Sequence, residues 1–315
     1  MTDVMVVGGG VIGLTAAIRL LQRGARVTVL EADDVRKSVS AVAAAVWYPT
    51  RTDEDPRVLR WATAAMAEFR RQHAEGVPGL ALRRTRMLLR RPADRLPWWA
   101  PAAGDVTAVP APPPYHGELR FTAPLAEMET YLPWLQNQLT SAGGRIARRR
   151  VRSLDEALGE APVVVNATGL AAGRLTGDKD LFPVRGHTVI VDNPGLDVSV
   201  RDEDNPAGMT YVHPRSRDVV LGGTFDPRRT GTGPDPDEAA AIVARCVALA
   251  PELAGARVVG ERIGLRPVRR GGPRLTSEAA AGGRRLVHAY GHGGAGMTLS
   301  WGCADEIADL ALADS

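Results

Sequence analysis

Three glycines near the N-terminus follow a short apolar segment in the pattern Gly8-x-Gly10-x-x-Gly13. An alanine-rich segment then begins at Val11 and is expected to form a helix up to Arg23. In such a unit the first glycine permits a tight turn, the second lets the backbone approach a pyrophosphate, and the third allows close packing of helix and strand. The free amides at the helix N-terminus favour an anion. The motif therefore predicts an α/β fold that binds a dinucleotide.

A second strand, RVTVL over residues 26–30, follows this helix and ends at Glu31. A carboxylate at that position can accept a hydrogen bond from a ribose hydroxyl. An NAD dehydrogenase would continue with further β-α-β units, whereas residues 32–51 are mostly small and include an aromatic pair. Such a segment can lie along a flavin, with Ser38 and Ser40 as hydroxyl donors to a phosphate. The sequence therefore favours FAD over NAD.

The composition bounds the number of domains and the classes of partner. At 315 residues the chain exceeds one compact core, so two domains are expected. The net charge of +3 is small, and the arginine-rich run 145–152 alternates with apolar residues, which favours a strand over a nucleic-acid surface. Cys246 and Cys303 form no CxxC or metal spacing, which indicates a reducing compartment and no bound metal. The apolar N-terminus lacks a basic leader and is broken by glycines, so we expect a cytoplasmic protein that contacts no membrane.

Periodicity and helix-breaking residues divide the middle of the chain. Helices are expected over residues 56–75, 125–142 and 235–249. The proline-rich residues 97–114 are expected to form a loop or lid. Between residues 187 and 275 the pattern changes to alternating strands, expected at HTVIVD, MTYVHPR, DVVLGG and ARVVGERIGLR. This region predicts a mostly antiparallel second domain inserted into the first.

Residues 287–303, VHAYGHGGAGMTLSWGC, contain four glycines within six positions, and a helical pattern follows from Met297 to about Leu312. Glycine in an ordered segment costs conformational entropy, so such a cluster indicates positive φ or a backbone that lies against something large and flat. A flexible loop before a terminal helix is the alternative from these residues alone. Earlier in the chain, PVVVNATG over 162–169 is expected to be a strand whose small residues Thr168 and Gly169 suit a cofactor contact.

Several of these segments together resemble the D-amino-acid oxidase family of FAD enzymes. They occur in the family order and cover the chain from end to end: VVGGGVIGL, AAAVWYP, NATG, PVRGH, TYVHPR, VVLGGT, GLRPVR and HAYGHGGAGMTLSWGCA. The resemblance implies a Rossmann-type α/β FAD-binding domain, like that of glutathione reductase, beside a mostly antiparallel α+β substrate domain. The FAD-binding domain is expected to be discontinuous, with residues 1–78, 125–180 and 281–315. The substrate domain would take residues 79–124 and 181–280.

The resemblance also implies the residues that contact a non-covalent FAD. The late glycine segment would pass beside the isoalloxazine ring, and the amides of Gly296, Met297 and Thr298 would stabilise negative charge near N1 and O2. Ala45 and Val46 would lie near N5, and Val151 beside the adenosine. The expected contacts are Gly8, Gly10, Val11, Ile12, Gly13, Glu31, Ala32, Ser38, Ser40, Ala44, Ala45, Val46, Trp47, Val151, Thr168, Gly169, Arg266, Gly293, Gly294, Gly296, Met297 and Thr298.

Three residues would hold the substrate if the resemblance is followed residue by residue. Arg266, in GLRPVR, matches the arginine that binds the substrate carboxylate through a two-pronged salt bridge. Tyr211, in TYVHPR, matches the tyrosine whose hydroxyl donates to the same carboxylate, and the Gly294 carbonyl would accept from the substrate amine. Two positions depart from the mammalian pattern: Ala207 stands in place of a lid tyrosine, and Tyr48 in place of a glutamine.

The implied reaction is oxidative deamination of D-amino acids by hydride transfer to the flavin, with oxygen as the second substrate and hydrogen peroxide as a product. Phe225 stands where acidic-substrate relatives place an arginine, which favours neutral side chains, although Arg215 and Arg217 are further candidates for a pocket cation. His213 and His292 are expected to be structural, because hydride transfer needs no base.

The alternatives are a D-aspartate or glycine oxidase, a flavin-binding regulatory protein, and an NAD(P)-dependent dehydrogenase. The missing later β-α-β units disfavour the dehydrogenase. Arg266 and Tyr211, each within an intact motif, disfavour the regulatory protein. The sequence leaves open whether the chain is a monomer or a homodimer.

Overall fold

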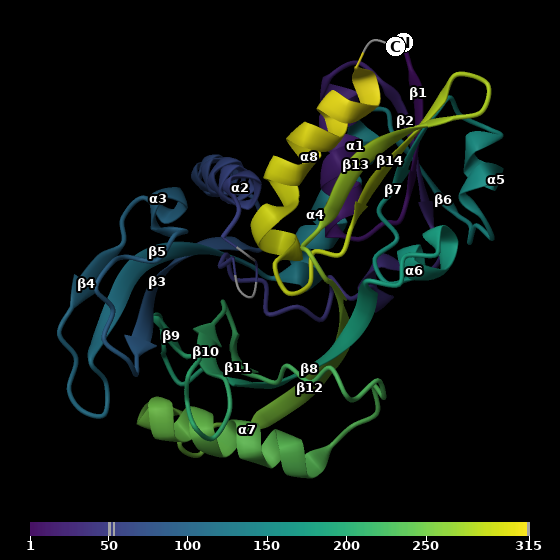
Figure 1. Cartoon of the computed structure of the whole chain (residues 1–315). Coiled ribbons are helices and arrows are strands. Elements are labelled where there is room, and N and C mark those ends of the chain that lie inside the picture. Colours follow the sequence, from purple (N-terminus) through teal and green to yellow (C-terminus); the bar gives the residue numbers. More distant parts are fainter. Residues whose placement is uncertain (50–51, 53, 314–315) are drawn as a thin grey trace.

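The structure is a computed structural model that describes residues 1–49, 52 and 54–313. Its strands form one six-stranded and one eight-stranded sheet, and the cofactor motif and the C-terminal helix belong to the first (Figure 1). This arrangement confirms the expected α/β fold with a mostly antiparallel second region. Among the described helices, none is long and apolar enough to cross a bilayer.

The six-stranded sheet has the order β13-β14-β7-β1-β2-β6. Its strands are β1 (Asp3–Val7), β2 (Arg26–Glu31), β6 (Arg145–Arg148), β7 (Val163–Asn166), β13 (Arg274–Ala280) and β14 (Arg284–Tyr290). All neighbours are parallel except the hairpin of β13 and β14. Val4 and Val6 belong to one hydrophobic cluster and Met5 and Val7 to another, so β1 is covered on both faces. That burial explains its uninterrupted apolar sequence.

Four of the longer helices are α1 (Val11–Gln22), α2 (Pro56–Ala74), α4 (Met128–Ser141) and α7 (Pro236–Leu249). Two of them carry the same start signal. The Asp55 side chain accepts from the Arg57 amide before Pro56, and the Asp235 side chain accepts from the Glu238 amide before Pro236. Each aspartate satisfies an amide that the helix cannot pair, and each proline occupies the first turn, where its missing N–H costs nothing.

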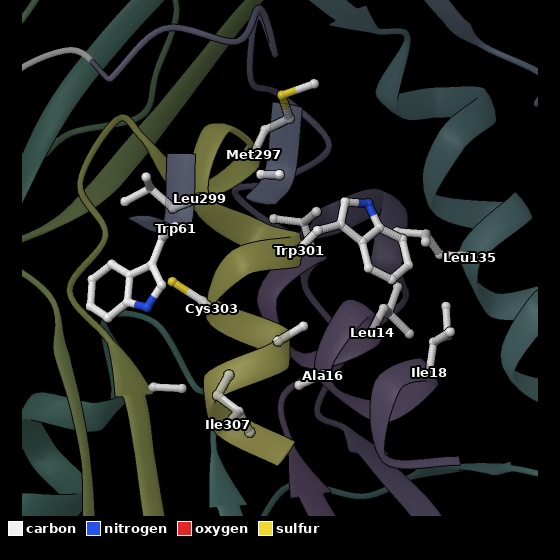
Figure 2. Packing of buried hydrophobic residues seen from close by; sticks show 14 of the residues in the cluster. Leu14, Ala16, Ile18, Trp61, Leu135, Met297, Leu299, Trp301, Cys303 and Ile307 are labelled. Carbon is white, nitrogen blue, oxygen red and sulfur yellow. The ribbon is translucent and has the colours of Figure 1, made fainter. Parts of the chain in front are cut away.

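The C-terminal helix α8 (Gly296–Leu312) packs between α1 and α2. Figure 2 shows Trp301 of α8 directed toward Leu14 and Leu135, while Trp61 lies near Cys303 on the other side. The indole N–H of Trp301 donates to the Tyr131 hydroxyl at 2.9 Å. At Gly302 the α2 backbone comes so close that an added Cβ would lie 2.3 Å from the Trp61 carbonyl oxygen. The absence of a side chain there allows the two helices to touch.

The eight-stranded sheet has the order β12-β8-β11-β10-β9-β3-β5-β4, with antiparallel neighbours except for the parallel pair β3 and β9. Its strands are β3 (Leu80–Leu89), β4 (Thr107–Val109), β5 (Gly117–Ala126), β8 (Leu181–Asp192), β9 (Ser199–Asp202), β10 (Thr210–Pro214), β11 (Asp218–Gly222) and β12 (Val258–Arg269). Helix α7 covers one face (Figure 1), where Ile242 and Cys246 pack against Val189, Val212 and Leu221. The other face is left for the cavity described below.

Short elements complete the chain: α3 (Ala100–Ala103), α5 (Leu154–Leu158), α6 (Ala171–Thr176), and the 3-10 turns η1 (Val35–Lys37) and η2 (Pro251–Leu253). The helices predicted at 56–75, 125–142 and 235–249 are present, with shifts of a few residues at their ends. The expectation of a loop or lid without regular structure over 97–114 was wrong, because α3, which contains Pro101, and β4 form within this range. The strand β9 was not anticipated.

The strand β13 also differs from the expected residue ranges. It was placed with the substrate domain, which was expected to extend to residue 280, yet it pairs along its whole length with β14 in the six-stranded sheet. β14 pairs with β7 on one side and forms an antiparallel hairpin with β13 on the other. Because a short turn joins the two strands of the hairpin, β13 lies in the same sheet as β14.

We predict that Gly302→Ala destabilises the protein by about 1–3 kcal/mol, because the new methyl group overpacks the contact with Trp61. In an uncrowded helix the same change would stabilise by roughly 0.5–1 kcal/mol, so the sign is diagnostic. The measurement is the free energy of unfolding of the flavin-loaded protein in urea. The matched control is Gly173→Ala in α6, where an added Cβ meets no atom closer than 3.5 Å. Equal stability of the two variants would contradict the proposed contact.

Candidate functional site

A cavity of about 500 Å³ is lined by residues of both sheets. That volume lies within the range of small-molecule sites. One end is formed by residues at the carboxyl ends of parallel strands, namely Val7 as the last residue of β1, Glu31 as the last residue of β2 and Ala167 directly after β7. The carboxyl edge is where open parallel sheets bind their ligands. The other end is formed by β8, β9, β10 and β12 of the eight-stranded sheet.

Each glycine of the N-terminal motif is required for a different steric reason. Gly8 has φ +118°, a conformation that side chains rarely adopt. A Cβ on Gly13 would lie 1.8 Å from the Gly8 carbonyl oxygen, so this glycine allows α1 to pack on the turn. Gly10 precedes α1, and a Cβ there would approach only the Ser40 hydroxyl, at 3.2 Å. The turn therefore leaves backbone exposed to the cavity in front of the helix N-terminus.

Glu31 is the buried acidic group of this end, with 2% of its surface exposed. The Gln136 side chain donates to its Oε1 at 2.7 Å, and Arg148 lies 3.9 Å from its Oε2. Burial raises the pKa of the carboxyl group against the effect of these two neighbours. The side chain is thus held at the cavity wall as a hydrogen-bond acceptor at the end of β2.

The segment after β2 folds back over the start of α1. Ser40 Oγ accepts from the Val11 amide at 3.1 Å, and Ser38 Oγ accepts from the Ala41 amide at 3.3 Å. Both hydroxyl groups line the cavity and retain a hydrogen to donate. Further along, Ala45 has φ +52°, unusual for a residue with a side chain. Its backbone turns there at the cavity wall, beside Val46.

The late glycine segment closes the same cavity from the other side. The first α-helical hydrogen bond of α8 runs from the Leu299 amide to the Ala295 carbonyl, so the preceding amides of the first turn have no helical acceptor. Gly291 has φ +84°, and a Cβ there would lie 2.7 Å from Arg269 Cβ. The Gly293 amide donates to the Pro267 carbonyl at 2.8 Å. This bond ties the segment to β12, one residue beyond Arg266.

Arg266 enters the cavity across a glycine. Its register partner on β8 is Val184, and the neighbouring Gly186 has no side chain that could block it, since a Cβ there would lie 2.2 Å from Nη1. Nη1 donates to the Thr224 carbonyl at 2.9 Å and to the Arg185 carbonyl at 3.3 Å. These two bonds fix the plane of the guanidinium group at the wall.

Tyr211 is buried on β10, and its ring occupies the space over two glycines. A Cβ on Gly222 would lie 1.9 Å from the ring and one on Gly223 would lie 2.7 Å from the hydroxyl oxygen. Burial raises the pKa of the phenol, with Arg266 and Arg201 acting in the opposite direction. The hydroxyl group therefore remains protonated and can donate a hydrogen bond.

The cavity brings together most of the residues that the sequence proposed. Its wall contains Gly8, Gly10, Val11, Ile12, Glu31, Ala32, Ser38, Ser40, Ala44, Ala45, Val46, Val151, Thr168, Gly169, Tyr211, Arg266, Gly293, Gly294, Gly296 and Met297. Gly13, Trp47 and Thr298 lie outside it. Trp47 donates its indole N–H to the Ala62 carbonyl at 3.2 Å, and the Thr298 hydroxyl group accepts from the Tyr48 amide and donates to the Tyr48 carbonyl.

Several wall residues were not anticipated as site residues, and the eight-stranded sheet supplies many of them. They include Thr188, Arg201, Met209, His213 and Arg262, together with Arg149 and Arg150 at the cofactor end. Phe225, which the sequence had placed beside the substrate side chain, also lies in the wall. Strand alternation could have suggested His213, two residues after Tyr211. Arg201 gave no signal, because β9 is only four residues long and its pairing partner is set by the fold.

Arg215 and Arg217, the further candidates for a pocket cation, lie outside the wall. Arg215 is held by Asp218 and Glu129.

The two histidines of the wall are buried and neutral. Burial lowers the pKa of His292 to about 4 and holds that of His213 well below its ordinary value, with Arg201 adding to the second shift. Among the described residues, Nε2 of His292 and Nδ1 of His213 have no hydrogen-bond partner. No group of three potential metal-ligating side chains gathers in the described part of the chain.

These features fit an FAD molecule. The exposed turn and amides before α1 suit a diphosphate, the buried Glu31 suits a ribose, and the first turn of α8 suits the electron-rich edge of a flavin. The cavity continues past the glycine segment to Tyr211 and Arg266. It therefore accommodates a second, smaller molecule with a carboxylate.

Comparison with known proteins agrees with this assignment. The FAD-dependent oxidoreductase family named DAO matches residues 3–310. A D-amino-acid oxidase of Rubrobacter xylanophilus is 49% identical over 98% of this chain and 95% of its own length. A D-amino-acid oxidase of Streptomyces coelicolor is 42% identical over 98% of this chain and 96% of its own.

The fold is also that of a solved oxidase. The glycine oxidase of Geobacillus kaustophilus superimposes with a TM-score of 0.84 at 21% identity, over 100% of this chain and 96% of the other. The chain belongs to the DAO family of FAD-dependent oxidoreductases.

Proposed function

We propose that this protein is a D-amino-acid oxidase that acts mainly on neutral D-amino acids. The observation that carries the proposal is the placement of Arg266, Tyr211 and Gly294 around one end of a cavity whose other end fits FAD. The relatives from Rubrobacter xylanophilus and Streptomyces coelicolor are both D-amino-acid oxidases. The reaction converts the amino acid and oxygen to an imino acid and hydrogen peroxide, and water then releases the 2-oxo acid and ammonia.

The substrate carboxylate binds to Arg266 and Tyr211. A guanidinium group offers a planar pair of donors that matches the two carboxylate oxygens, which an ammonium group cannot. The Tyr211 hydroxyl group, kept protonated by its burial, donates to the same carboxylate. The Thr224 and Arg185 carbonyls hold the guanidinium plane before the substrate arrives, so little ordering is required on binding.

The amine of the substrate is oriented by the Gly294 carbonyl. The bond between the Gly293 amide and the Pro267 carbonyl keeps this segment at a fixed distance from the Arg266 strand. With carboxylate and amine both held, the Cα–H of a D-amino acid takes one orientation toward the flavin. When bound, FAD would supply the oxidation as the acceptor of the hydride, with oxygen as the final electron acceptor. The chain contributes orientation, and the α8 amides stabilise negative charge.

A preference for neutral side chains follows from the remaining wall. Phe225 lies where a second cation would be needed, and the Arg266 guanidinium carbon is 5.7 Å from its ring centroid. Arg262 is paired with Glu129, and both wall histidines are neutral. A second carboxylate on the substrate would therefore lose its hydrating water without meeting a cation that is free to pair with it. Burying a charge in this way is costly.

The six-stranded sheet lines the cofactor end of the cavity and the eight-stranded sheet lines the substrate end, which supports a two-domain protein. The proposed FAD-binding domain comprises residues 1–78, 125–180 and 274–315, where the start of the last segment now includes β13. The remaining residues form the substrate domain. We further propose a cytoplasmic location, since Cys246 and Cys303 are both free and buried.

A peroxide assay across a panel of D- and L-amino acids tests the proposed activity. D-Alanine, D-valine and D-phenylalanine should be oxidised with higher kcat/KM than D-aspartate or D-glutamate, and the L-enantiomers should be inactive. A higher kcat/KM for D-aspartate than for the neutral substrates would point to a D-aspartate oxidase. Peroxide from glycine alone would point to a glycine oxidase.

The purified protein should be yellow and should release all of its flavin on acid precipitation, as FAD and not as FMN. Neither cysteine lies in the cavity wall, which removes the thiols that could form a covalent link. The measurement is the absorbance and chromatography of the supernatant. Flavin retained in the protein pellet would contradict a non-covalent cofactor.

Arg266→Leu should reduce kcat/KM for D-alanine by on the order of a hundred- to several-thousand-fold. The loss corresponds to the roughly 3–5 kcal/mol cost of leaving one partner of a desolvated ion pair. Arg266→Lys should fall between leucine and wild type, because it keeps the charge but loses the planar pair of donors. Both variants should still bind FAD.

The matched control is Arg270→Leu, an exposed arginine four residues further along that lies outside the cavity wall. Arg269 is less suitable, because it pairs with the largely buried Asp178. If Arg266→Leu kept activity within a few-fold of wild type, the carboxylate would have to bind elsewhere.

A further inference from the structure

Arg201, on β9, is a cation in the cavity wall that the proposed reaction does not use. Its register partner across the antiparallel pair of β9 and β10 is Tyr211. Partners in such a pair project from the same face of the sheet, and both residues line the cavity. His213 stacks on the Tyr211 ring with centroids 4.6 Å apart and belongs to the same wall. Arg201 therefore lies beside the tyrosine assigned to the substrate carboxylate.

The environment of Arg201 is unusually dry for a charged group. Its side chain is 6% exposed. The guanidinium carbon lies 3.8 Å from the centroid of the Tyr48 ring, whose face attracts a cation. Within the described part of the chain, Nε is buried and has no hydrogen-bond partner. Such a charge is retained in a protein interior only when a partner compensates it.

Glu203 is that partner. Its carboxylate forms an ion pair with Nη2 of Arg201. Glu203 lies outside the cavity wall, whereas Arg201 and Tyr48 are both part of it. Burial raises the pKa of the Tyr48 phenol, and the nearby Glu203 carboxylate adds to that shift. The cavity thus faces the guanidinium group, and the compensating charge is placed behind it.

We propose that Arg201 and Glu203 form a masked cation that determines which side chains the enzyme accepts. As a neutral pair it provides hydrogen-bond donors to a substrate side chain but no net positive charge. Without the charge of Glu203, the same guanidinium group becomes a site for the side-chain carboxylate of an acidic D-amino acid. The inference rests on the proposed function and deepens it, since it names the group that selects neutral substrates.

The other arginines near the pair already have partners, so Arg201 is the one that loss of the Glu203 charge would make available to a substrate carboxylate. Arg266 is committed to the α-carboxylate of the substrate. Arg262 pairs with Glu129, and Arg215 pairs with Asp218 outside the wall. A purely structural role for the Arg201–Glu203 pair makes a different prediction: loss of Glu203 would then impair all substrates to a similar degree.

The test compares D-aspartate with D-asparagine, which have nearly the same shape and differ in side-chain charge. In the flavin-loaded Glu203→Gln variant, the ratio of kcat/KM for D-aspartate to that for D-asparagine should rise at least about tenfold over wild type. A tenfold change corresponds to about 1.4 kcal/mol, below the range measured for close charge pairs at interfaces. The ratio of competitive inhibition constants for succinate and succinamate, measured against D-alanine, reports the same preference by binding alone.

Two further variants isolate the cause. Adding Arg201→Met to Glu203→Gln should remove the gain, because the unmasked cation is then absent. Asp197→Asn removes the same charge from the exposed pair with Arg84 and should leave the ratio at the wild-type value.

An unchanged ratio in a Glu203→Gln protein that still oxidises D-alanine would overturn the inference and leave the proposed function intact. A wild-type protein that oxidises no D-amino acid would reject the proposed function instead. If Glu203→Gln fails to fold, Arg201→Met alone decides the question. It leaves the Glu203 charge uncompensated and should weaken succinate relative to succinamate, and an unchanged ratio there would equally overturn the inference.

Discussion

The contact between Gly302 and the backbone at Trp61 sets the position of α8, and α8 in turn sets the geometry of the cavity. The helix lies close enough to α2 that a single methyl group would not fit. Trp301 fixes the rotation of the helix through its bond to Tyr131, as Figure 2 illustrates for its packing against Leu14 and Leu135. The first turn of α8, whose amides have no helical acceptor, is thereby held at the cavity wall. A packing contact in the core thus determines where a partial positive charge meets the cofactor.

The second sheet contributes a wall whose chemistry depends on strand register. Tyr211 and Arg201 are neighbours only because β10 pairs with β9 in one particular alignment. Arg266 reaches the same space because Gly186, on the adjacent strand, has no side chain. A shift of one residue in either pair would turn these side chains to the face covered by α7. The two sheets are connected at the site itself by the bond from the Gly293 amide to Pro267.

The sequence predicted well those features that are encoded locally. The β-α-β unit with Glu31 and the late glycine cluster each require specific residues at fixed spacing, and each was located. Arg201 could not be found in this way, because its importance depends on Tyr48 and Glu203, which meet it only in the folded chain. The pairing of β13 was missed for a related reason: an exposed, polar edge strand has no hydrophobic pattern to identify its sheet. Chemistry with a sequence signature is readable, whereas chemistry formed by long-range pairing is not.

The order of strands in the six-stranded sheet has a consequence for synthesis of the protein. The central strand β1 is made first, yet its neighbour β7 follows only after β3, β4 and β5 of the eight-stranded sheet, and α8 comes last of all. A growing chain therefore cannot complete the cofactor crevice until nearly all of it has left the ribosome. Such distant pairing slows folding and leaves apolar strand surface exposed in the meantime. Flavin binds only the folded state of the chain. Its supply during synthesis would then influence how much protein is recovered in active form.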